Sequence, residues 1–222
     1  MTAPTNTTTT RTGRGHLRVV RTDAAHRNDG ALRHTAIGPL ELELGGYLDD
    51  VTVAWRSWGQ LNERGDNAVI VLHALTGDSN AGGEGGWWEP VIGPGKPLDT
   101  DTHFVLCSNI LGGCQGTTGP ASIDPETGRP WAMHFPLITI GDMVAAQRRL
   151  VEELGITSVV PIGGSIGGFQ ALEWATRHSE LVRGSAVIAA SGALGAQGIA
   201  LHGEVGRRAI MSDPAWHNGD YA

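Results

Sequence analysis

A serine with glycines two residues before and two residues after it stands in the segment Gly163-Gly164-Ser165-Ile166-Gly167. An apolar run at residues 158–162 precedes this segment, and an amphipathic helical pattern at residues 166–178 follows it. A sharp turn from strand to helix strains the backbone of its serine, and glycines at these two positions prevent collisions between neighbouring residues. The Ser165 hydroxyl would then project from the carboxyl edge of a sheet, above the positive end of the helix. The pattern predicts a nucleophile that forms a covalent intermediate; the simpler alternative is a serine that only caps the helix.

Two backbone N–H groups are expected to stabilise the negative charge that develops when such a serine attacks a carbonyl. The first belongs to Ile166, because the residue after the nucleophile supplies one donor in proteins with this motif. The second comes from the loop after an earlier strand, here the one at residues 68–72, and our candidate is the N–H of Leu75. His73 in the same loop is an alternative catalytic base, but its position at the strand end favours a structural role.

The segments around these residues predict an α/β fold. Residues 40–44 and 51–55 alternate between apolar and polar side chains on either side of a turn at Gly45-Gly46, which predicts an antiparallel hairpin. The later strands are dominated by apolar residues, as in a parallel sheet covered on both faces, and they fall at residues 68–72, 103–107, 158–162 and 185–189. Helical patterns occupy residues 142–154, capped by Asp142 and ended by Gly155, and residues 166–178 and 196–210. Alternation of strands and helices after an antiparallel start is typical of an α/β protein.

Three segments that are long, uncommon and in a fixed order carry a resemblance to a known family. They are His73-Ala74-Leu75-Thr76-Gly77-Asp78-Ser79, Ser108-Asn109-Ile110-Leu111-Gly112-Gly113-Cys114-Gln115-Gly116-Thr117-Thr118-Gly119-Pro120 and Gly163-Gly164-Ser165-Ile166-Gly167-Gly168-Phe169-Gln170-Ala171-Leu172-Glu173-Trp174. On these segments the chain resembles the homoserine O-acetyltransferase family, which belongs to the α/β-hydrolase superfamily. The resemblance covers nearly all of residues 40–222. It implies an α/β-hydrolase fold, mostly parallel with an antiparallel N-terminal hairpin, truncated at the start of a helical lid.

The resemblance also implies an activity. It is the transfer of an acetyl group from acetyl-CoA to the hydroxyl of L-homoserine through an acyl-enzyme on Ser165, with ping-pong kinetics, as a step of methionine biosynthesis. Acetyl-CoA would be a co-substrate, with no further cofactor, and the full-length protein would be a homodimer. The alternatives are a homoserine O-succinyltransferase, another serine-nucleophile acyltransferase or esterase, or an inactive fragment that binds a partner through an exposed sheet edge.

A serine nucleophile needs a base and an orienting acid, which in this fold follow the serine as Asp or Glu and then His. The later histidines are His178, His202 and His217. His178 falls at the far end of the helix that Ser165 begins, ~20 Å away at the rise of an α-helix. The other two fall where the family begins its lid. We therefore expect the acid and the base beyond residue 222, so that the chain is the N-terminal part of a longer protein and is inactive alone.

Two glycine-rich loops are expected near this site. Residues 109–120 are expected to line its approach, although an ordinary surface loop is the alternative. Residues 82–88 are similarly placed, and their two tryptophans would otherwise only anchor the loop to the core. By domain, we expect a disordered N-terminal arm at residues 1–36, the α/β-hydrolase core at residues 37–192 and the start of the lid at residues 193–222.

Composition excludes several other classes of protein. With 222 residues and a net charge of −7, the chain lacks the clustered cations of a nucleic-acid binder. Its single lysine, Lys96, is followed by proline, which excludes a P-loop. No apolar run is long enough to span a membrane, and the N-terminus lacks a secretory signal. Cys107 and Cys114 are typical of a reduced protein, and the nine histidines lack metal-ligand spacing. We expect a cytoplasmic protein without metal, nucleic-acid or membrane partners.

Overall fold

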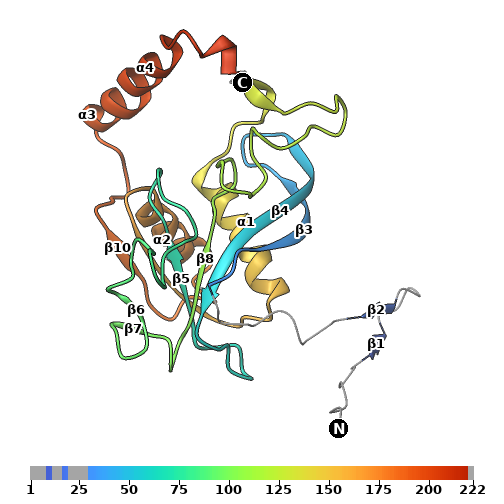
Figure 1. The fold of residues 1–222 in the computed structure, drawn as a ribbon, viewed down its shortest axis with the longest axis vertical. Coiled ribbons are helices and arrows are strands. Elements are labelled where there is room, and N and C mark those ends of the chain that lie inside the picture. Colours follow the sequence, from blue (N-terminus) through green and yellow to red (C-terminus); the bar gives the residue numbers. More distant parts are fainter. Residues whose placement is uncertain (1–8, 12–16, 20–29, 220–222) are drawn as a thin grey trace.

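The computed structural model describes residues 9–11, 17–19 and 30–219, and a six-stranded sheet forms its centre (Figure 1). The strand order is β10-β9-β5-β8-β4-β3. Four strands run parallel: β5 (Ala68–Leu72), β8 (Phe104–Ser108), β9 (Val159–Gly164) and β10 (Ala186–Ile188). The other two, β3 (Arg33–Glu41) and β4 (Tyr47–Trp58), form an antiparallel hairpin that joins the sheet through β8. The predicted mostly parallel sheet with an antiparallel N-terminal hairpin is confirmed.

Two short ladders lie outside this sheet. One pairs β1 (Thr9–Arg11) with β2 (Leu17–Val19) in antiparallel orientation. The other pairs β6 (Ile92–Gly93) with β7 (Leu98–Asp99) in parallel orientation. The sequence patterns predicted neither ladder, because each strand is too short to show an alternation of side chains.

The hairpin is longer than the alternation of side chains predicted. β3 begins at Arg33, within the segment expected to be a disordered arm, while residues 1–8, 12–16 and 20–29 of that arm lie outside the described residues. The added residues contact Trp55 of β4: the indole Nε1 donates to Thr35 Oγ1 at 2.9 Å, and the Arg33 guanidinium lies 5.4 Å from the ring centroid. These contacts across the two strands explain why polar residues extend the hairpin.

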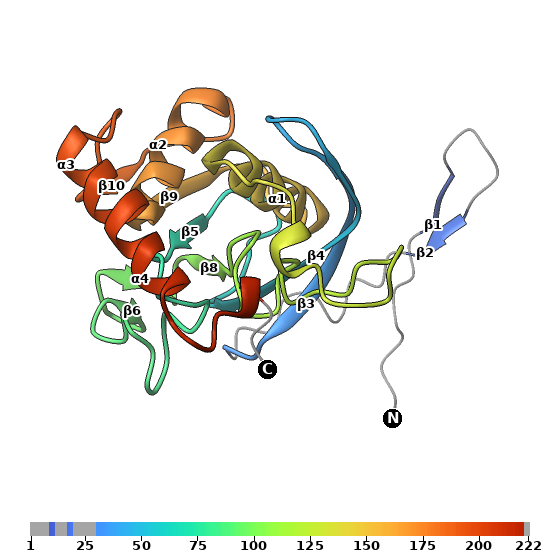
Figure 2. The same ribbon diagram turned by 90° about the horizontal axis from the view of Figure 1, so that it is seen from above.

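Helices α1 (Ile140–Glu153) and α2 (Ile166–Arg177) pack on the same face of the sheet (Figure 2). α1 begins earlier than predicted, since its N-cap is Thr139 and not Asp142. Thr139 Oγ1 accepts from Asp142 N at 3.1 Å, and Asp142 Oδ2 accepts from Thr139 N at 2.8 Å. In this reciprocal capping box, Asp142 is the acidic residue at position N3. Asp142 therefore does take part in capping α1, but not as the N-cap residue that the sequence predicted.

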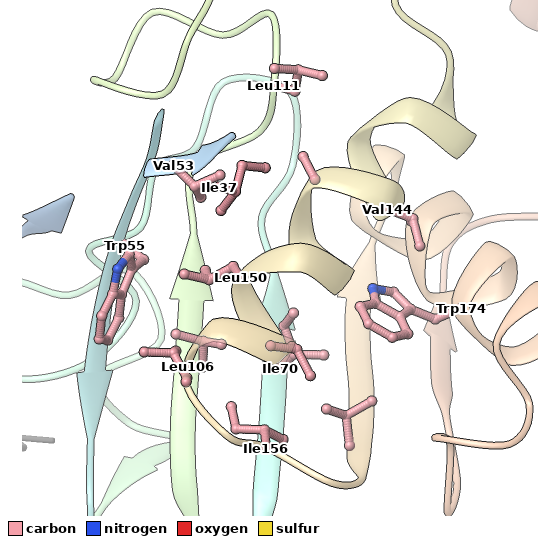
Figure 3. Close-up of a cluster of buried hydrophobic side chains, with 14 of the residues drawn as sticks. Ile37, Val53, Trp55, Ile70, Leu106, Leu111, Val144, Leu150, Ile156 and Trp174 are labelled. Carbon is pink, nitrogen blue, oxygen red and sulfur yellow. The ribbon is translucent and has the colours of Figure 1, made fainter. Parts of the chain in front are cut away.

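The main hydrophobic core lies between these helices and the sheet (Figure 3). Leu150 and Trp174 from the helices and Ile70 and Leu106 from the strands are fully buried there. The opposite face of the sheet is covered by the segment between β5 and β8, in which Ala81 and Ile92 of β6 pack with the strand residues Val71 and Cys107. Both faces are therefore buried, as the apolar strand sequences require.

The last helical segment extends away from the sheet (Figure 1). It consists of α3 (Ala196–Gly198), a π-helix η2 (Ile199–Gly206) and α4 (Arg207–Met211) in succession. Its exposed apolar side chains include Ile199, Leu201, Val205, Ile210 and Met211. Beyond it, η3 (His217–Gly219) returns to η1 (Ala132–His134), where Gly219 lies against Met133. Among the described residues, no helix is both long and apolar enough to cross a bilayer.

Glu43, in the turn between β3 and β4, ties the hairpin to both helices. Its carboxylate accepts from Thr139 Oγ1 at 2.6 Å and pairs with Arg177, while its backbone N–H donates to Asp142 Oδ1 at 2.9 Å. The hydrogen bond from Thr139, aided by the Arg177 charge, holds the pKa of Glu43 below its ordinary value of 4.5, although partial burial opposes the shift. The negative charge of this carboxylate therefore favours the folded state.

We predict that Glu43→Gln lowers the free energy of unfolding at neutral pH, by less than about 1 kcal/mol because solvent screens the pair. A carboxyl with a depressed folded pKa contributes stability above its ordinary pKa, and that contribution is lost as pH falls through the folded value. Urea unfolding should therefore separate the two proteins at neutral pH, and the difference between their midpoints should shrink as pH falls below the ordinary pKa of 4.5. Glu126→Gln, at an exposed position, is the control; an equal effect of both changes at neutral pH would contradict the prediction.

Candidate active site

The backbone of Ser165 is strained as the motif predicts. Its φ of 57° and ψ of −123° lie in a region that non-glycine residues rarely adopt. The serine occupies the N-cap position of α2 but makes no side-chain capping bond, which contradicts the alternative of a simple helix cap. Its N–H donates to Ile188 O of β10 at 3.1 Å, so the turn is attached to the neighbouring strand. The side chain is exposed at the carboxyl edge of the sheet.

Close packing explains two of the glycines around Ser165. A Cβ atom on Gly163 would lie far inside 3.0 Å of Gly167 O, and one on Gly167 would lie equally close to the Leu72 carbonyl. Gly164 differs, since a Cβ atom there would come no nearer than 3.9 Å to Ile188 O. The glycines two before and two after the serine are therefore required for space, as predicted, whereas the one directly before it is not.

The two expected oxyanion donors, Leu75 and Ile166, follow the ends of two adjacent parallel strands, β5 and β9, at the same edge of the sheet. Leu72 at the end of β5 pairs with Gly163 near the end of β9, so the loop with Leu75 begins beside the turn with Ser165. Within residues 30–219, the backbone N–H groups of Leu75 and Ile166 donate to no acceptor. Both groups are thus available to a ligand, which is the state that an oxyanion hole requires.

His73 is buried at the end of β5, with 2% of its surface exposed. Its Nδ1 lies 2.8 Å from the carbonyl oxygen of Ala74 and donates to it, while Nε2 has no partner among the described residues. Burial lowers the pKa of His73, which favours the neutral imidazole. These contacts are those of a residue that shapes the loop carrying Leu75, in agreement with the structural role expected of it.

The later histidines lie away from Ser165 in the chain. His178 follows the last turn of α2, where its ring meets the Trp174 ring at 5.3 Å between centroids. His202 in η2 and His217 in η3 are exposed. In the part of the chain that the structure describes, the Ser165 hydroxyl has no hydrogen-bond partner. The described residues thus provide a strained serine and two donors, but no base bonded to it.

A cavity of about 640 Å³ opens beside Leu75 and is mostly apolar. The loop expected to line the approach contributes residues 109–115 and Pro120, and His73 also faces the cavity. Residues 132–138 complete it with Met133, Phe135, Pro136, Leu137 and Ile138. The sequence patterns did not predict this last segment, although its cluster of apolar residues outside any strand or long helix was an available signal.

Asn109 connects the two loops that flank the cavity. Its Oδ1 accepts from Ser79 N at 2.6 Å, and its Nδ2 donates to Gln115 O at 2.5 Å. Its carbonyl oxygen accepts from Thr117 Oγ1 at 2.8 Å, and Thr117 Oγ1 in turn accepts from Ala54 N of β4. The loop at residues 109–120 is therefore held by specific buried contacts, unlike an ordinary surface loop.

The glycine-rich loop at residues 82–88 is anchored by its two tryptophans. Trp88 packs against the core on the second face of the sheet. Trp87 is 40% exposed and donates its Nε1 hydrogen to Asp78 O at 2.9 Å. With Gly85, it borders a second hollow that Thr76 and Asp78 also line. Anchoring to the core, one of the two expectations, accounts for Trp88.

Groups for metal binding do not assemble in the described ranges. Among residues 9–11, 17–19 and 30–219, no three or more His, Cys, Asp or Glu side chains are placed to hold an ion. Cys107 is buried in β8, which raises the pKa of its thiol, whereas Cys114 is exposed beside the cavity.

We predict that Gly167→Ala and Gly163→Ala lower the free energy of unfolding by about 3 kcal/mol, the upper end of the usual range for overpacking, or prevent folding, because their Cβ atoms would overlap backbone atoms. Gly164→Ala, the matched control one residue from Ser165, should change it by less than about 1 kcal/mol. Urea unfolding of the three variants tests this difference. Similar losses at all three positions would show that the steric account of the motif is wrong.

We also predict that the two cysteines react at very different rates with a thiol-specific disulfide reagent. One equivalent of thiol should react quickly in the native protein and the second only on unfolding, because a buried thiol with a raised pKa supplies little thiolate. Cys114→Ser should abolish the fast phase, and Cys107→Ser should leave it unchanged. Two fast thiols in the native protein would contradict the burial of Cys107.

Residues 67–221 match the family model described as the alpha/beta hydrolase fold, and the chain belongs to this family. Within it, the chain is 53% identical over 190 residues to a homoserine O-acetyltransferase of Carboxydothermus hydrogenoformans, covering 82% of this chain and 50% of that protein. The chain spans about half the length of the curated relatives it matches.

Solved structures agree with this assignment. A homoserine O-acetyltransferase from Bacillus anthracis has a TM-score of 0.75 at 30% identity, covering 86% of this chain and 55% of that one. Esterase E22 has a TM-score of 0.76 at 31% identity, with coverages of 86% and 56%. The resemblance to homoserine O-acetyltransferases and the predicted fold class are confirmed.

Proposed function

We propose that this chain carries the nucleophile and oxyanion hole of a homoserine O-acetyltransferase. The reaction is transfer of an acetyl group from acetyl-CoA to the hydroxyl of L-homoserine, a step of methionine biosynthesis. The observation that carries the proposal is the backbone of Ser165, strained and uncapped at the start of α2. The choice of substrates is supported by relatives named homoserine O-acetyltransferase, to which the chain is 53% and 54% identical in sequence.

In the proposed first half-reaction, Ser165 Oγ attacks the thioester carbonyl carbon while a base takes the hydroxyl proton. The negative charge moves to the carbonyl oxygen, where the N–H groups of Leu75 and Ile166 donate hydrogen bonds. Each such donor is worth roughly 10²–10³ in rate. The carbonyl then re-forms, the carbon–sulfur bond breaks, and the base returns the proton to the departing CoA thiol. Acetyl-Ser165 remains.

The second half-reaction repeats these steps with a different nucleophile. The hydroxyl oxygen of L-homoserine attacks the acetyl carbon, its proton passes to the base, and the same two N–H groups hold the oxyanion. Collapse breaks the bond to Ser165 Oγ, which takes the proton back. Water at about 55 M in bulk competes for the acetyl group, so the reaction requires a site that excludes solvent. We assign that exclusion to a lid that begins with residues 193–222.

The proposed base is a histidine and its orienting group is an Asp or Glu, both beyond residue 222, in the order Ser, acid, His that this fold uses. Removal of the base from such a site costs roughly 10⁴–10⁶ in rate, so this chain alone would be nearly inactive. Acetyl-CoA acts as a co-substrate, with no resident cofactor. The exposed apolar side chains of residues 196–211 are consistent with a homodimer of the full-length protein, which stays a prediction.

An esterase is the second candidate function. Esterase E22 matches this chain as well as the Bacillus anthracis acetyltransferase does, with TM-scores of 0.76 and 0.75. Both activities use the same serine and the same oxyanion hole, and they differ only in whether water or another hydroxyl accepts the acyl group. A succinyl donor in place of acetyl is the corresponding alternative for the first half-reaction.

We predict that Ser165→Ala in the full-length polypeptide lowers homoserine-dependent release of CoA from acetyl-CoA by about 10⁴-fold or more, because no acyl-enzyme can form. The release of free thiol with and without L-homoserine measures this. Ser158→Ala, whose hydroxyl donates to Asp66 O before the start of β9, is the matched control and should keep full activity.

Three other outcomes are informative. Free acetate released without L-homoserine would favour the esterase, and faster turnover with succinyl-CoA would favour the succinyl donor. Undiminished turnover by Ser165→Ala would remove the proposed mechanism.

A further inference from the structure

Two glutamine side chains are buried between α1 and α2. Gln147 of α1 has 2% of its surface exposed and Gln170 of α2 has none, although both helices contribute residues to the hydrophobic core, among them Leu150 and Trp174. Burial of an amide is costly unless its polar atoms form hydrogen bonds. Two leucines would fill similar space without this cost, so the pair requires a specific explanation.

The two amides form a continuous chain of hydrogen bonds. Trp174 Nε1 donates to Gln147 Oε1 at 2.9 Å, and Gln147 Nε2 donates to Gln170 Oε1 at 2.6 Å. Gln170 Nε2 then donates to the carbonyl oxygen of Ile166 at 3.2 Å. All three bonds point the same way, so each amide polarises the next. Figure 3 shows the Trp174 ring between the two helices.

The chain of bonds ends at the first residue of α2. Ile166 follows the strained Ser165 directly, and its N–H is one of the two proposed oxyanion donors. A strained backbone persists only where the surrounding structure fixes it. Gln170 contacts this first turn from the core side, while the Ser165 N–H is held by Ile188 O from the sheet side.

We propose that Gln170, oriented by Gln147, is a positioning residue for the Ser165 turn. It fixes the first turn of α2 and thereby the direction of the Ile166 N–H. The inference rests on the proposed function, because it assumes that Ser165 is the nucleophile. A displacement of about 1 Å in such a site lowers the rate by roughly 10²-fold, so the contribution is measurable even though Gln170 touches no substrate.

The test compares three substitutions along the chain of bonds. Gln170→Met, similar in length but without the amide, should lower kcat of the full-length polypeptide by roughly 10- to 100-fold and leave KM for acetyl-CoA nearly unchanged. Gln147→Met leaves the bond from Gln170 to Ile166 in place, so its effect should be smaller. Trp174→Phe removes the bond that lies furthest from Ile166, so it should have the smallest effect on kcat. It nevertheless removes part of a large, fully buried side chain.

A chemical readout separates positioning from folding. The rate constant for reaction of Ser165 with a p-nitrophenyl phosphonate is measured for each variant of the full-length polypeptide well below its unfolding temperature, with Ser165→Ala as the blank. The control is Leu150→Ala, a fully buried change on α1 that should lower the unfolding temperature at least as much as Gln170→Met. We expect Leu150→Ala to react with the wild-type rate constant and Gln170→Met to react roughly 10- to 100-fold more slowly.

The outcomes distinguish the two proposals. If the wild-type serine does not react, the proposed function fails and the positioning role fails with it. If the wild-type serine reacts and Gln170→Met reacts equally fast, only the positioning role is overturned. A rate loss that Leu150→Ala shares at equal stability also overturns it. If Gln170→Met does not fold, Gln147→Met provides the test. The positioning role predicts that its rate constant with the phosphonate falls roughly 3- to 10-fold, and an unchanged rate constant would overturn that role.

Discussion

The close contact between the first turn of α2 and the end of β5 is the constraint on which the candidate site depends. Gly167 approaches the Leu72 carbonyl so closely that no side chain fits between them, and Gly163 lies equally close to Gly167. This contact fixes the helix against the sheet and leaves Ser165 no relaxed conformation at the bend. The exposed hydroxyl and the free Ile166 N–H follow from the same geometry, because a residue held at this bend can neither cap the helix nor extend the strand.

The rest of the fold maintains that contact from both sides. The parallel pairing of Leu72 with Gly163 brings the Leu75 loop beside the serine, and buried His73 supports the loop from below. α1 packs along α2, with the two buried glutamines between them. Glu43 joins the hairpin to the cap of α1 and to Arg177 at the end of α2, so the most distant strands of the sheet also restrain the helix that begins at the site.

Much of this could be predicted because local physics and tertiary structure agree in these segments. Ala68–Leu72 was placed to the residue, since an apolar run between polar residues has one register in a buried strand. The start of α2 was placed equally well, because the glycines around Ser165 admit only one kind of turn. Where two readings were locally equal, the prediction was wrong: Asp142 can cap a helix or serve as the third residue of a capping box, and only the contacts with Thr139 decide. The early start of β3 at Arg33 depends on contacts with Trp55, which is distant in sequence. Residues 132–138 line the cavity together with residues from other loops, and that arrangement is likewise not visible in the local sequence.

A backbone hydrogen bond links the turn at Ser165 to the edge of the sheet. Among the described residues, β10 is one of the two edge strands of the sheet, and the carbonyl of its last residue, Ile188, accepts from the N–H of Ser165. An edge strand is the part of a sheet that opens locally most readily. Detachment of β10 would therefore release the serine's backbone before the interior of the protein loosened. Any contact that shields this edge strand would therefore also hold the Ser165 hydroxyl in position, through one backbone hydrogen bond.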